Sequence, residues 1–388
     1  MRGRTYNRRV SSLRVGFDGL AFGLPPGGVR RYVRELSCAL RGVDPQLELV
    51  AVGASANAGL PSGVVNADAR RWLPTNLGWC IDGLPRAVRR AAVDVFHAPA
   101  YTAPLWGVHP LVLTIHDVSY ERHPEWYPYR IDPVRRWFYR RSAEAADIVI
   151  TDSEFSRREI EAAYGLAAGR VRVIPLGVGA PFLPSPDESR SSFHDRAPRI
   201  LHVGDLHLRR NVPVLVEALA LLRARNDALK GTELVLVGVD RGAGEAIVSR
   251  AGKLGITDGI RFVPGADDGA VVALLREADV FAYPSLYEGF GLPVLEAMAC
   301  GVPVIASTAA SIPEVVGEAG LLLDPHDIRG WYDALVEVMT SAPRRAALRH
   351  AGLMRAAAFT WNRTAEQTLM LYQELAPSAR SSVSSVSL

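Results

Sequence analysis

Residues 278–306 read ADVFAYPSLYEGFGLPVLEAMACGVPVIA, and this stretch decides the fold of the chain. Its apolar residues 279–283 predict a strand, residues 284–291 a loop rich in Pro and Gly, and residues 293–300 a short helix. A second strand is expected over residues 302–306. A strand, a glycine loop, a helix and another strand form one unit of a parallel sheet. The loop of such a unit opens at the carboxyl edge of the sheet, where parallel sheets bind ligands.

Two carboxylates flank this loop and helix, Glu288 in the loop and Glu296 in the helix. Pro293 suits the first helical position because its missing N–H costs nothing there, and this places Glu296 in the first turn. Three backbone N–H groups ahead of the helix can bind an anion, which the helix dipole also favours: those of Phe290, Gly291 and Leu292. Either glutamate alone is more simply a solvated charge or a helix-start residue. Together they offer acceptors for hydroxyls beside donors for phosphate, as a sugar nucleotide requires.

The pattern Glu-Gly-Phe-Gly-Leu-Pro-x-x-Glu-Ala-Met-Ala-x-Gly-x-Pro-Val resembles the E-x₇-E signature of retaining glycosyltransferases of family 4 (glycosyl transferases group 1), mannosyltransferase-like. This resemblance covers nearly the whole chain. It implies the GT-B fold, in which two Rossmann-like, doubly wound parallel-sheet domains face each other across a cleft. It also implies that Glu288 contacts the donor sugar, that Glu296 binds the ribose hydroxyls, and that the amides of residues 290–292 hold sugar and phosphate.

The composition is that of an ordinary globular protein. The chain has 388 residues, 48% of them hydrophobic and 22% charged, which is enough for two domains with sizeable cores. A net charge of only +3 argues against nucleic acid as a partner. Three scattered cysteines, Cys38, Cys80 and Cys300, argue against a disulfide framework and favour the reducing cytoplasm. We expect neither a secretory signal at the arginine-bearing N-terminus nor a membrane-spanning segment.

Strand-like runs alternate with helical segments on both sides of a Pro- and Ser-rich stretch. This alternation predicts an α/β chain with a doubly wound parallel sheet in each half. Strands are expected at residues 13–17, 47–53, 93–97, 111–115, 147–151, 170–175, 199–203, 233–237, 260–263, 279–283, 302–306 and 321–323. With the resemblance, the expected divisions are a basic extension (1–12), an N-terminal acceptor-side domain (13–180), a linker (181–198), a C-terminal nucleotide-sugar-binding domain (199–359), a terminal helix crossing back to the first domain (360–376) and a disordered tail (377–388).

Two features of the first half extend the resemblance. Gly27 and Gly28 precede a predicted helix; alone they indicate a tight turn, but they resemble the glycine loop whose amides face the donor diphosphate. His116 and Asp117 directly follow a predicted strand and resemble the family's His-Asp pair beside sugar and acceptor, although a lone histidine there is usually structural. His97, at another strand end, is interpreted as local packing.

In the second half, Arg209 and Arg210 precede a predicted helix, where paired guanidiniums can hold a diphosphate bidentately. A solvated arginine pair is the simpler alternative. The pair resembles the family's Arg-Lys pair, with Arg210 standing where lysine is usual, which alters the geometry but keeps the charge. Asp267 and Asp268 are interpreted as loop residues.

The resemblance implies transfer of a hexosyl group with retention. Arg209, Arg210 and the Gly27–Gly28 amides would stabilise the leaving diphosphate by preorganised electrostatics, and His116 would contact sugar hydroxyls or the acceptor. No Asp-x-Asp motif occurs, so we predict no metal site, no cofactor, and activity that survives a chelator. The alternatives are a nucleotide-sugar epimerase of similar shape and a non-catalytic sugar-nucleotide-binding subunit.

Donor and acceptor are less specified. The patterns Gly-Val-x-Arg-Tyr, His-Asp and Arg-Arg-Asn look most like mannosyl- and rhamnosyl-type transferases of surface polysaccharide pathways. GDP-mannose is therefore the preferred donor, with UDP- and dTDP-sugars open, and the acceptor is a glycan or a polyprenyl-linked glycan. Residues 130–141 mix arginines with aromatic residues, which can bind the inner face of a membrane peripherally or can simply be a solvated helix with a buried aromatic side.

Overall fold

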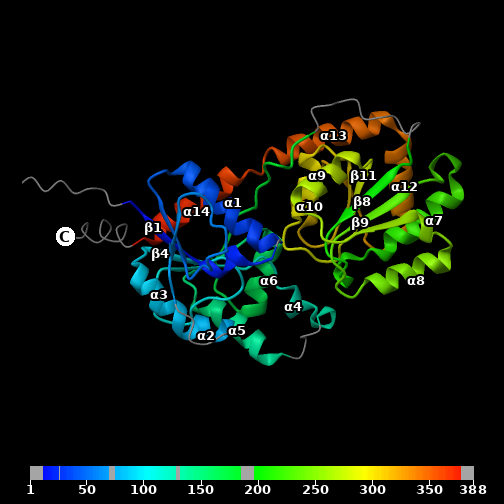
Figure 1. The fold of residues 1–388 in the computed structure, drawn as a ribbon. Coiled ribbons are helices and arrows are strands. Elements are labelled where there is room, and N and C mark those ends of the chain that lie inside the picture. Colours follow the sequence, from blue (N-terminus) through cyan, green and yellow to red (C-terminus); the bar gives the residue numbers. More distant parts are fainter. Residues whose placement is uncertain (1–11, 26, 70–74, 128–131, 185–195, 377–388) are drawn as a thin grey trace, which may run out of the picture.

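The structure is a computed structural model, and it describes residues 12–25, 27–69, 75–127, 132–184 and 196–376. Two α/β domains lie side by side, each built on one parallel sheet (Figure 1). The predicted α/β architecture with two doubly wound parallel sheets is confirmed. The predicted basic extension, most of the predicted linker (residues 185–195) and the predicted tail lie outside the described residues.

The first sheet has seven parallel strands in the order β3-β2-β1-β4-β5-β6-β7. The strands are β1 Arg14–Asp18, β2 Glu48–Val52, β3 Val64–Ala67, β4 Val95–Ala98, β5 Leu111–Thr114, β6 Ile148–Thr151 and β7 Val171–Val173. Every predicted strand of this half is present, and β3 is an additional one. The sequence pattern missed β3 because this short edge strand leaves Val65 and Asn66 exposed and so lacks an apolar run.

The second sheet has six parallel strands in the order β10-β9-β8-β11-β12-β13. The strands are β8 Arg199–Val203, β9 Glu233–Val237, β10 Ile260–Val263, β11 Val280–Tyr283, β12 Val304–Ser307 and β13 Leu321–Leu323. The strand order reverses direction between β8 and β11, and in such sheets the crevice at this switch point is where ligands bind. The loop after β11 carries Glu288.

Helices cover both faces of each sheet because alternate strand residues face opposite layers. In the first domain, Val15 and Phe17 pack in the layer of α1 and α14, whereas Val50 and Val52 pack in the layer of α3, α5 and α6. The helices and short helical turns of this domain are η1 Gly19–Gly23, α1 Gly28–Val43, α2 Asn76–Gly78, η2 Trp79–Gly83, α3 Leu84–Ala91, α4 Ser119–Arg122, η3 Pro124–Trp126, α5 Pro133–Ala145 and α6 Glu154–Tyr164.

The same alternation shapes the second domain. Leu201 and Phe281 pack in the layer of α9 and α10, whereas Ile200 and Val280 pack in the layer of α7, α8 and α12. Its helices and helical turns, together with the final helix, are η4 Leu208–Arg210, α7 Pro213–Arg225, η5 Asp227–Leu229, α8 Gly244–Leu254, η6 Thr257–Gly259, α9 Asp268–Glu277, α10 Leu292–Ala299, α11 Ile312–Val316, α12 Ile328–Thr340, α13 Ala342–Ala356 and α14 Trp361–Leu375.

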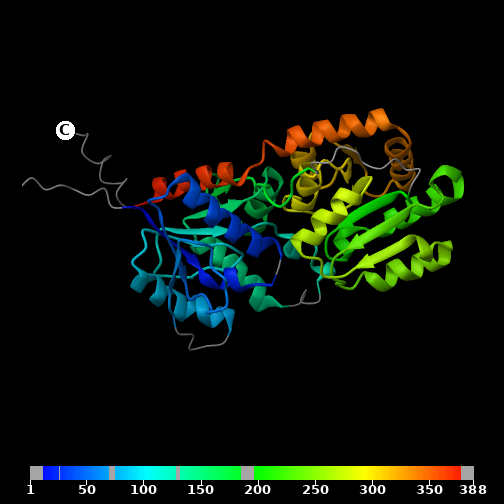
Figure 2. The same cartoon turned by 45° about the horizontal axis from the view of Figure 1, so that its top comes forward.

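The chain passes between the domains at two adjacent crossings. The N–H of Val178 donates to the carbonyl of Phe359 (3.0 Å), and Val178 pairs with Thr360 in an isolated parallel bridge. A Cβ at Gly177 would lie 2.2 Å from the Trp361 nitrogen, so only glycine allows the two crossings to approach this closely. Figure 2 shows α13 (orange) and α14 (red) following one another along one side of the molecule.

Helix α14 is held on the first domain by a buried polar chain as well as by apolar packing. The hydroxyl of Tyr372 lies 2.5 Å from Nδ1 of His97, whose Nε2 lies 2.7 Å from the Thr114 hydroxyl. Burial lowers the pKa of His97 to about 3, with a further contribution from the charge of His116, so the ring stays neutral in this chain of bonds. The interpretation of His97 as a packing residue is therefore confirmed.

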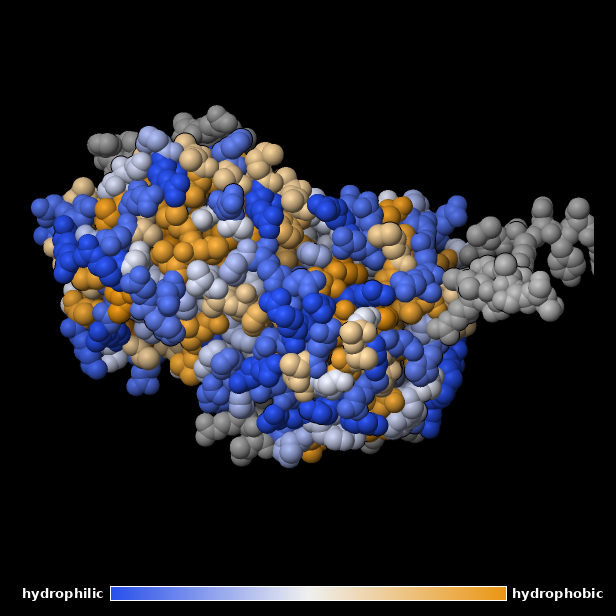
Figure 3. Space-filling view, turned by 180° about the vertical axis from the view of Figure 1, so that it is seen from behind, coloured by the Kyte–Doolittle hydropathy of each residue, from blue (hydrophilic) through white to orange (hydrophobic). Residues whose placement is uncertain are grey.

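The surface shows polar and apolar residues intermixed over both domains in the view from behind (Figure 3). Among the described residues, no helix combines the length and apolar character that crossing a bilayer requires. On α5 the aromatic residues divide: Phe138 is buried, whereas Trp137 is half-exposed, and Arg136 pairs with Glu121.

Candidate active site

The loop after β11 delivers Glu288 and Glu296 to one end of the second sheet. Gly291 caps α10 with φ 110°, a left-handed conformation that favours glycine, and Leu292 is already helical. Pro293 is therefore the second helical residue, and the prediction that it is the first is wrong by one position. Glu296 accordingly begins the second turn. No hydrogen bond runs from the N–H groups of residues 290–292 to a described residue, so they remain available to an anion.

Glu288 and Arg210 form a buried ion pair within the second domain. The same guanidinium nitrogen of Arg210 contacts the Tyr283 hydroxyl and lies 3.5 Å from that of Ser285. Burial lowers the pKa of Arg210, and the positive charge of neighbouring Arg209 lowers it further. Tyr283 acts in the opposite direction but does not outweigh them. The sequence assigned Glu288 to sugar and Arg210 to phosphate separately; the structure joins them, which fixes the carboxylate in one orientation.

Arg209 forms a second pair, this time between domains. Its Nη1 lies 3.2 Å from Oδ2 of Asp117, which follows β5 in the first domain. Oδ1 of Asp117 accepts from the N–H and the hydroxyl of Ser119 at 2.9 and 2.7 Å. Burial alone would raise the pKa of Asp117, but Arg209 and Ser119 lower it, so this residue is ionised. The two arginines predicted from the sequence thus lie together in the cleft, each with its own carboxylate.

His116 is held by Asp152, which follows β6. Nδ1 of His116 lies 2.7 Å from Oδ2 of Asp152, while Nε2 is buried and lies within hydrogen-bonding geometry of no atom of the described residues. Burial disfavours the imidazolium, but the carboxylates of Asp152 and Asp117 and the nearby Pro99 carbonyl outweigh it and raise the pKa of His116. The carboxylate of Asp152 therefore fixes the orientation of the imidazole.

Asp152→Asn is expected to lower the pKa of His116. The amide removes the carboxylate charge that raises this pKa most, whereas burial, which lowers the pKa, remains. NMR titration of the His116 ring proton measures this change. Because the pKa of His116 is raised in the folded state, its pair with Asp152 stabilises the fold fully at pH values below about 6.5, the pKa of histidine in the unfolded chain. This stabilisation is lost as the pH rises through the pKa of His116 in the folded state. The variant should therefore also lose this pH dependence of its melting temperature; an unchanged His116 pKa would contradict the assignment.

Gly289 is the point where the Glu288 loop touches the first domain. A Cβ at Gly289 would lie 2.1 Å from the carbonyl oxygen of His116. The carbonyl of Gly289 accepts from the hydroxyls of Ser153 (2.7 Å) and Ser156 (3.1 Å), and Ser156 also reaches the His116 carbonyl at 3.1 Å. Gly289, Ser153 and Ser156 were not predicted from the sequence, although the first glycine of Glu-Gly-Phe-Gly was a signal for a close approach.

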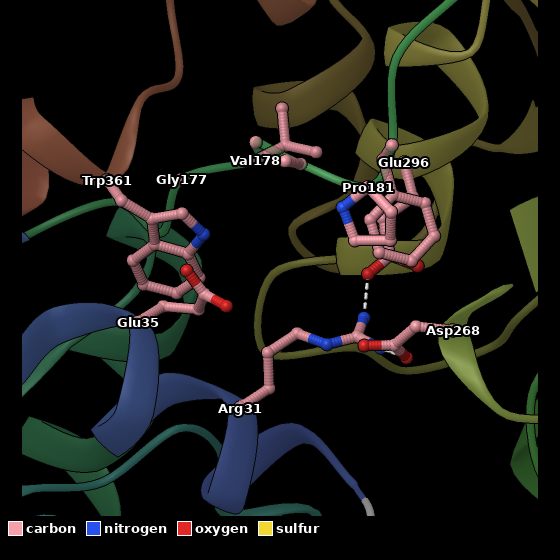
Figure 4. A pocket seen from close by; sticks show the side chains of 11 residues that line it. Arg31, Glu35, Gly177, Val178, Pro181, Asp268, Glu296 and Trp361 are labelled. Atoms are coloured by element: carbon pink, nitrogen blue, oxygen red, sulfur yellow. Dashed lines mark hydrogen bonds and ion pairs between the residues drawn. The ribbon is translucent and has the colours of Figure 1, made fainter. Parts of the chain in front are cut away.

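The glycine pair at the start of α1 is exposed, and a Cβ at Gly28 would meet nothing within 4 Å. No contact with a described residue therefore demands glycine at this position. One turn along α1, Arg31 forms ion pairs with Glu296 and Asp268 of the second domain (Figure 4). Arg31 is the arginine of the Gly-Val-x-Arg-Tyr pattern, for which the sequence predicted no contact. Asp268 is the first residue of α9 and not a loop residue.

Among the described residues, no three His, Cys, Asp or Glu side chains converge as they would around a metal ion. The candidate site instead consists of three arginine–carboxylate pairs, two of them between domains, with the Glu288 loop seated against His116.

Comparison with known proteins identifies the family. Residues 26–180 match "Glycosyltransferase Family 4" and residues 197–341 match "Glycosyl transferases group 1". O-antigen chain mannosyltransferase B of Escherichia coli is 31% identical over 291 residues, which cover 72% of this chain and 74% of that protein. The chain belongs to glycosyltransferase family 4. This family 4 enzyme is thus a glycosyltransferase of a retaining family that uses a nucleotide sugar, and the resemblance seen in the sequence is confirmed.

Further relatives agree. A D-inositol 3-phosphate glycosyltransferase of Salinispora tropica is 31% identical over 298 residues, covering 72% of this family 4 chain and 62% of the relative. Among solved structures, sucrose-phosphate synthase from Thermosynechococcus elongatus aligns with a TM-score of 0.74 at 22% identity, covering 94% of this chain and 99% of the other. This likeness confirms the GT-B fold.

Proposed function

We propose that the enzyme transfers a hexosyl group, mannosyl from GDP-mannose in the preferred case, to a glycan or lipid-linked acceptor during surface polysaccharide or glycolipid synthesis. The observation that carries the proposal is the seating of the Glu288 loop against His116 and Asp117, because it puts donor-side and acceptor-side groups at one point of the cleft. The preference for mannose is supported by the name of the Escherichia coli relative.

Each group has a role that follows from its surroundings. Arg210 contacts Oε1 of Glu288, and Oε2 receives no hydrogen bond from a described residue, so it can accept from a donor-sugar hydroxyl. As the bond from the anomeric carbon to the diphosphate breaks, negative charge grows on the leaving oxygen. We propose that Arg209 and Arg210 stabilise that charge by preorganised electrostatics, and that the His116 ring contacts a sugar or acceptor hydroxyl.

The nucleotide is proposed to bind at the second domain. Glu296 would accept from the ribose hydroxyls, the amides of residues 290–292 would donate to sugar and phosphate, and the Gly27–Gly28 backbone would face the diphosphate across the cleft. UDP- and dTDP-sugars are the alternatives to GDP-mannose. A thermal-shift panel of nucleoside diphosphates distinguishes them, since a ligand that binds only the folded state raises the melting temperature.

Catalysis is proposed to take place in the cytoplasm, where the thiols of Cys38, Cys80 and Cys300 stay reduced. A peripheral contact with the inner face of the membrane is proposed through α5, on which Val134 and Trp137 are exposed beside arginines.

The decisive test is turnover of GDP-mannose by the purified enzyme with and without a polyprenyl-linked glycan acceptor, in buffer containing EDTA. We expect nucleotide release that requires the acceptor and an anomeric product configuration equal to that of the donor. Conversion of the donor without an acceptor would indicate an epimerase or a hydrolase. Complete loss of activity in EDTA that Mg²⁺ or Mn²⁺ restores would contradict the proposed metal-free stabilisation of the diphosphate.

A further inference from the structure

The guanidinium of Arg31 lies where the proposed function places the nucleotide ribose. Arg31 projects from α1 of the first domain, and its two terminal nitrogens contact Glu296 of α10 and Asp268 of α9 in the second domain. The ring of Phe182, from the segment after the first crossing, lies 5.0 Å from the guanidinium carbon. Figure 4 shows the arginine reaching across to Glu296 beside the crossing segments.

The two side chains of this ion pair differ in how deeply they are buried. The Glu296 side chain is 6% exposed and is fixed on a buried helix, whereas the Arg31 side chain is 26% exposed. A buried carboxylate needs a partner, and in this structure Arg31 is that partner. The guanidinium contacts Oε1 of Glu296, and a ribose diol bonded to both carboxylate oxygens would compete with it there. Binding of the nucleotide must therefore move the guanidinium and not the carboxylate.

The moved guanidinium stays close to the start of its own helix. The N–H of Arg31 donates to the carbonyl of Gly27 at 3.0 Å, so Arg31 lies one turn from the glycine pair. A donor diphosphate at the glycine pair offers oxygens in the arrangement that arginine binds bidentately.

We propose that Arg31 and the nucleotide ribose compete for Glu296, and that Arg31 transfers to the donor diphosphate when the nucleotide binds. This inference rests on the proposed function, because it takes Glu296 as the ribose ligand. It makes Arg31 a donor-binding residue and couples donor binding to release of an ion pair that joins the two domains.

The proposal makes opposite predictions for two ligands. A nucleoside competes with Arg31 for Glu296 but has no phosphate, so Arg31→Met should tighten its binding about threefold. For a nucleoside diphosphate the same variant also loses the charge-assisted contact between the Arg31 guanidinium and the phosphates. It should therefore bind the diphosphate about tenfold more weakly. Methionine keeps an unbranched apolar side chain at this position and removes the guanidinium, including its contact with the Phe182 ring.

Isothermal titration with GDP and guanosine, and in parallel UDP and uridine, measures both effects on the full chain. Arg30→Met is the matched control: it removes the same charge from the neighbouring position, and Arg30 makes no ion pair with a described residue. We expect the control to keep both affinities within about twofold. The melting temperatures of both variants establish that they are folded.

Equal weakening of nucleoside and nucleoside diphosphate in Arg31→Met would overturn the inference, because Arg31 would then only support the site. Tighter binding of both would also overturn it, because the guanidinium would leave for solvent. If the wild-type enzyme binds none of the four ligands, both the proposed function and the inference about Arg31 fail. Failure of the proposed function is therefore seen in the wild-type enzyme, whereas failure of the inference alone is seen only in Arg31→Met.

Discussion

Replacing Glu288 by glutamine is expected to lower the turnover number about 100- to 1000-fold, the usual effect of removing one preorganised electrostatic contact. Glutamine keeps the length of the side chain and an oxygen that accepts from Arg210, but it removes the negative charge that we assign to orienting the donor sugar. Initial rates at saturating donor and acceptor measure the effect. The loss should appear in kcat more than in the KM for the donor, because the nucleotide contacts that we propose for Arg209, Glu296 and the backbone amides are kept.

Alanine is a poorer test at this position. Glu288 and Arg210 have side-chain exposures of only 8% and 11%, so Glu288→Ala leaves a buried guanidinium without its carboxylate. Breaking a buried pair in this way destabilises a protein by about 3–5 kcal/mol and would confuse unfolding with lost chemistry. Glu318→Gln, an exposed change in the same domain, is the matched control and should keep full activity. Normal turnover by folded Glu288→Gln would remove the proposed role.

Gly289→Ala is expected to reduce kcat/KM at least about 100-fold, as misplacement of reacting groups by about 1 Å does in other enzymes. The added Cβ would lie 2.1 Å from the His116 carbonyl oxygen and 3.1 Å from Cβ of Asp117. Neither backbone can yield locally, since the Ser153 and Ser156 hydroxyls hold this contact. The domains must therefore separate, which moves the Glu288 loop away from His116.

Gly252→Ala in α8 is the matched control, because a Cβ there meets nothing within 4 Å and alanine favours a helix. It should be active and equally or slightly more stable. Small-angle scattering of Gly289→Ala should show a larger radius of gyration than the wild type. Full activity with unchanged scattering would show that the loop and His116 need not touch during catalysis.

The local sequence predicted each half of the site. Glu288 and Glu296 were recognised from one continuous motif, and Arg209 and Arg210 from their position before a helix, because these arrangements depend on residues near in the chain. Their pairing was not predictable. Arg210 meets Glu288 across 78 positions, and Arg209 meets Asp117 across 92. Such contacts depend on which strands are neighbours and on how the domains meet.

The order of apolar runs, glycine loops and helix starts in the sequence was sufficient to determine two parallel-sheet domains and the motif that identifies the family. It also predicted twelve of the thirteen strands found in the part of the chain that the structure describes. These features follow from alternation and spacing, which act over a few residues. Tertiary structure alone decided that Arg31 covers Glu296, that Gly289 touches His116 and that Tyr372 binds His97. Each of these contacts joins residues more than 170 positions apart. Their geometry depends on how the domains and the final helix pack, which no local pattern records.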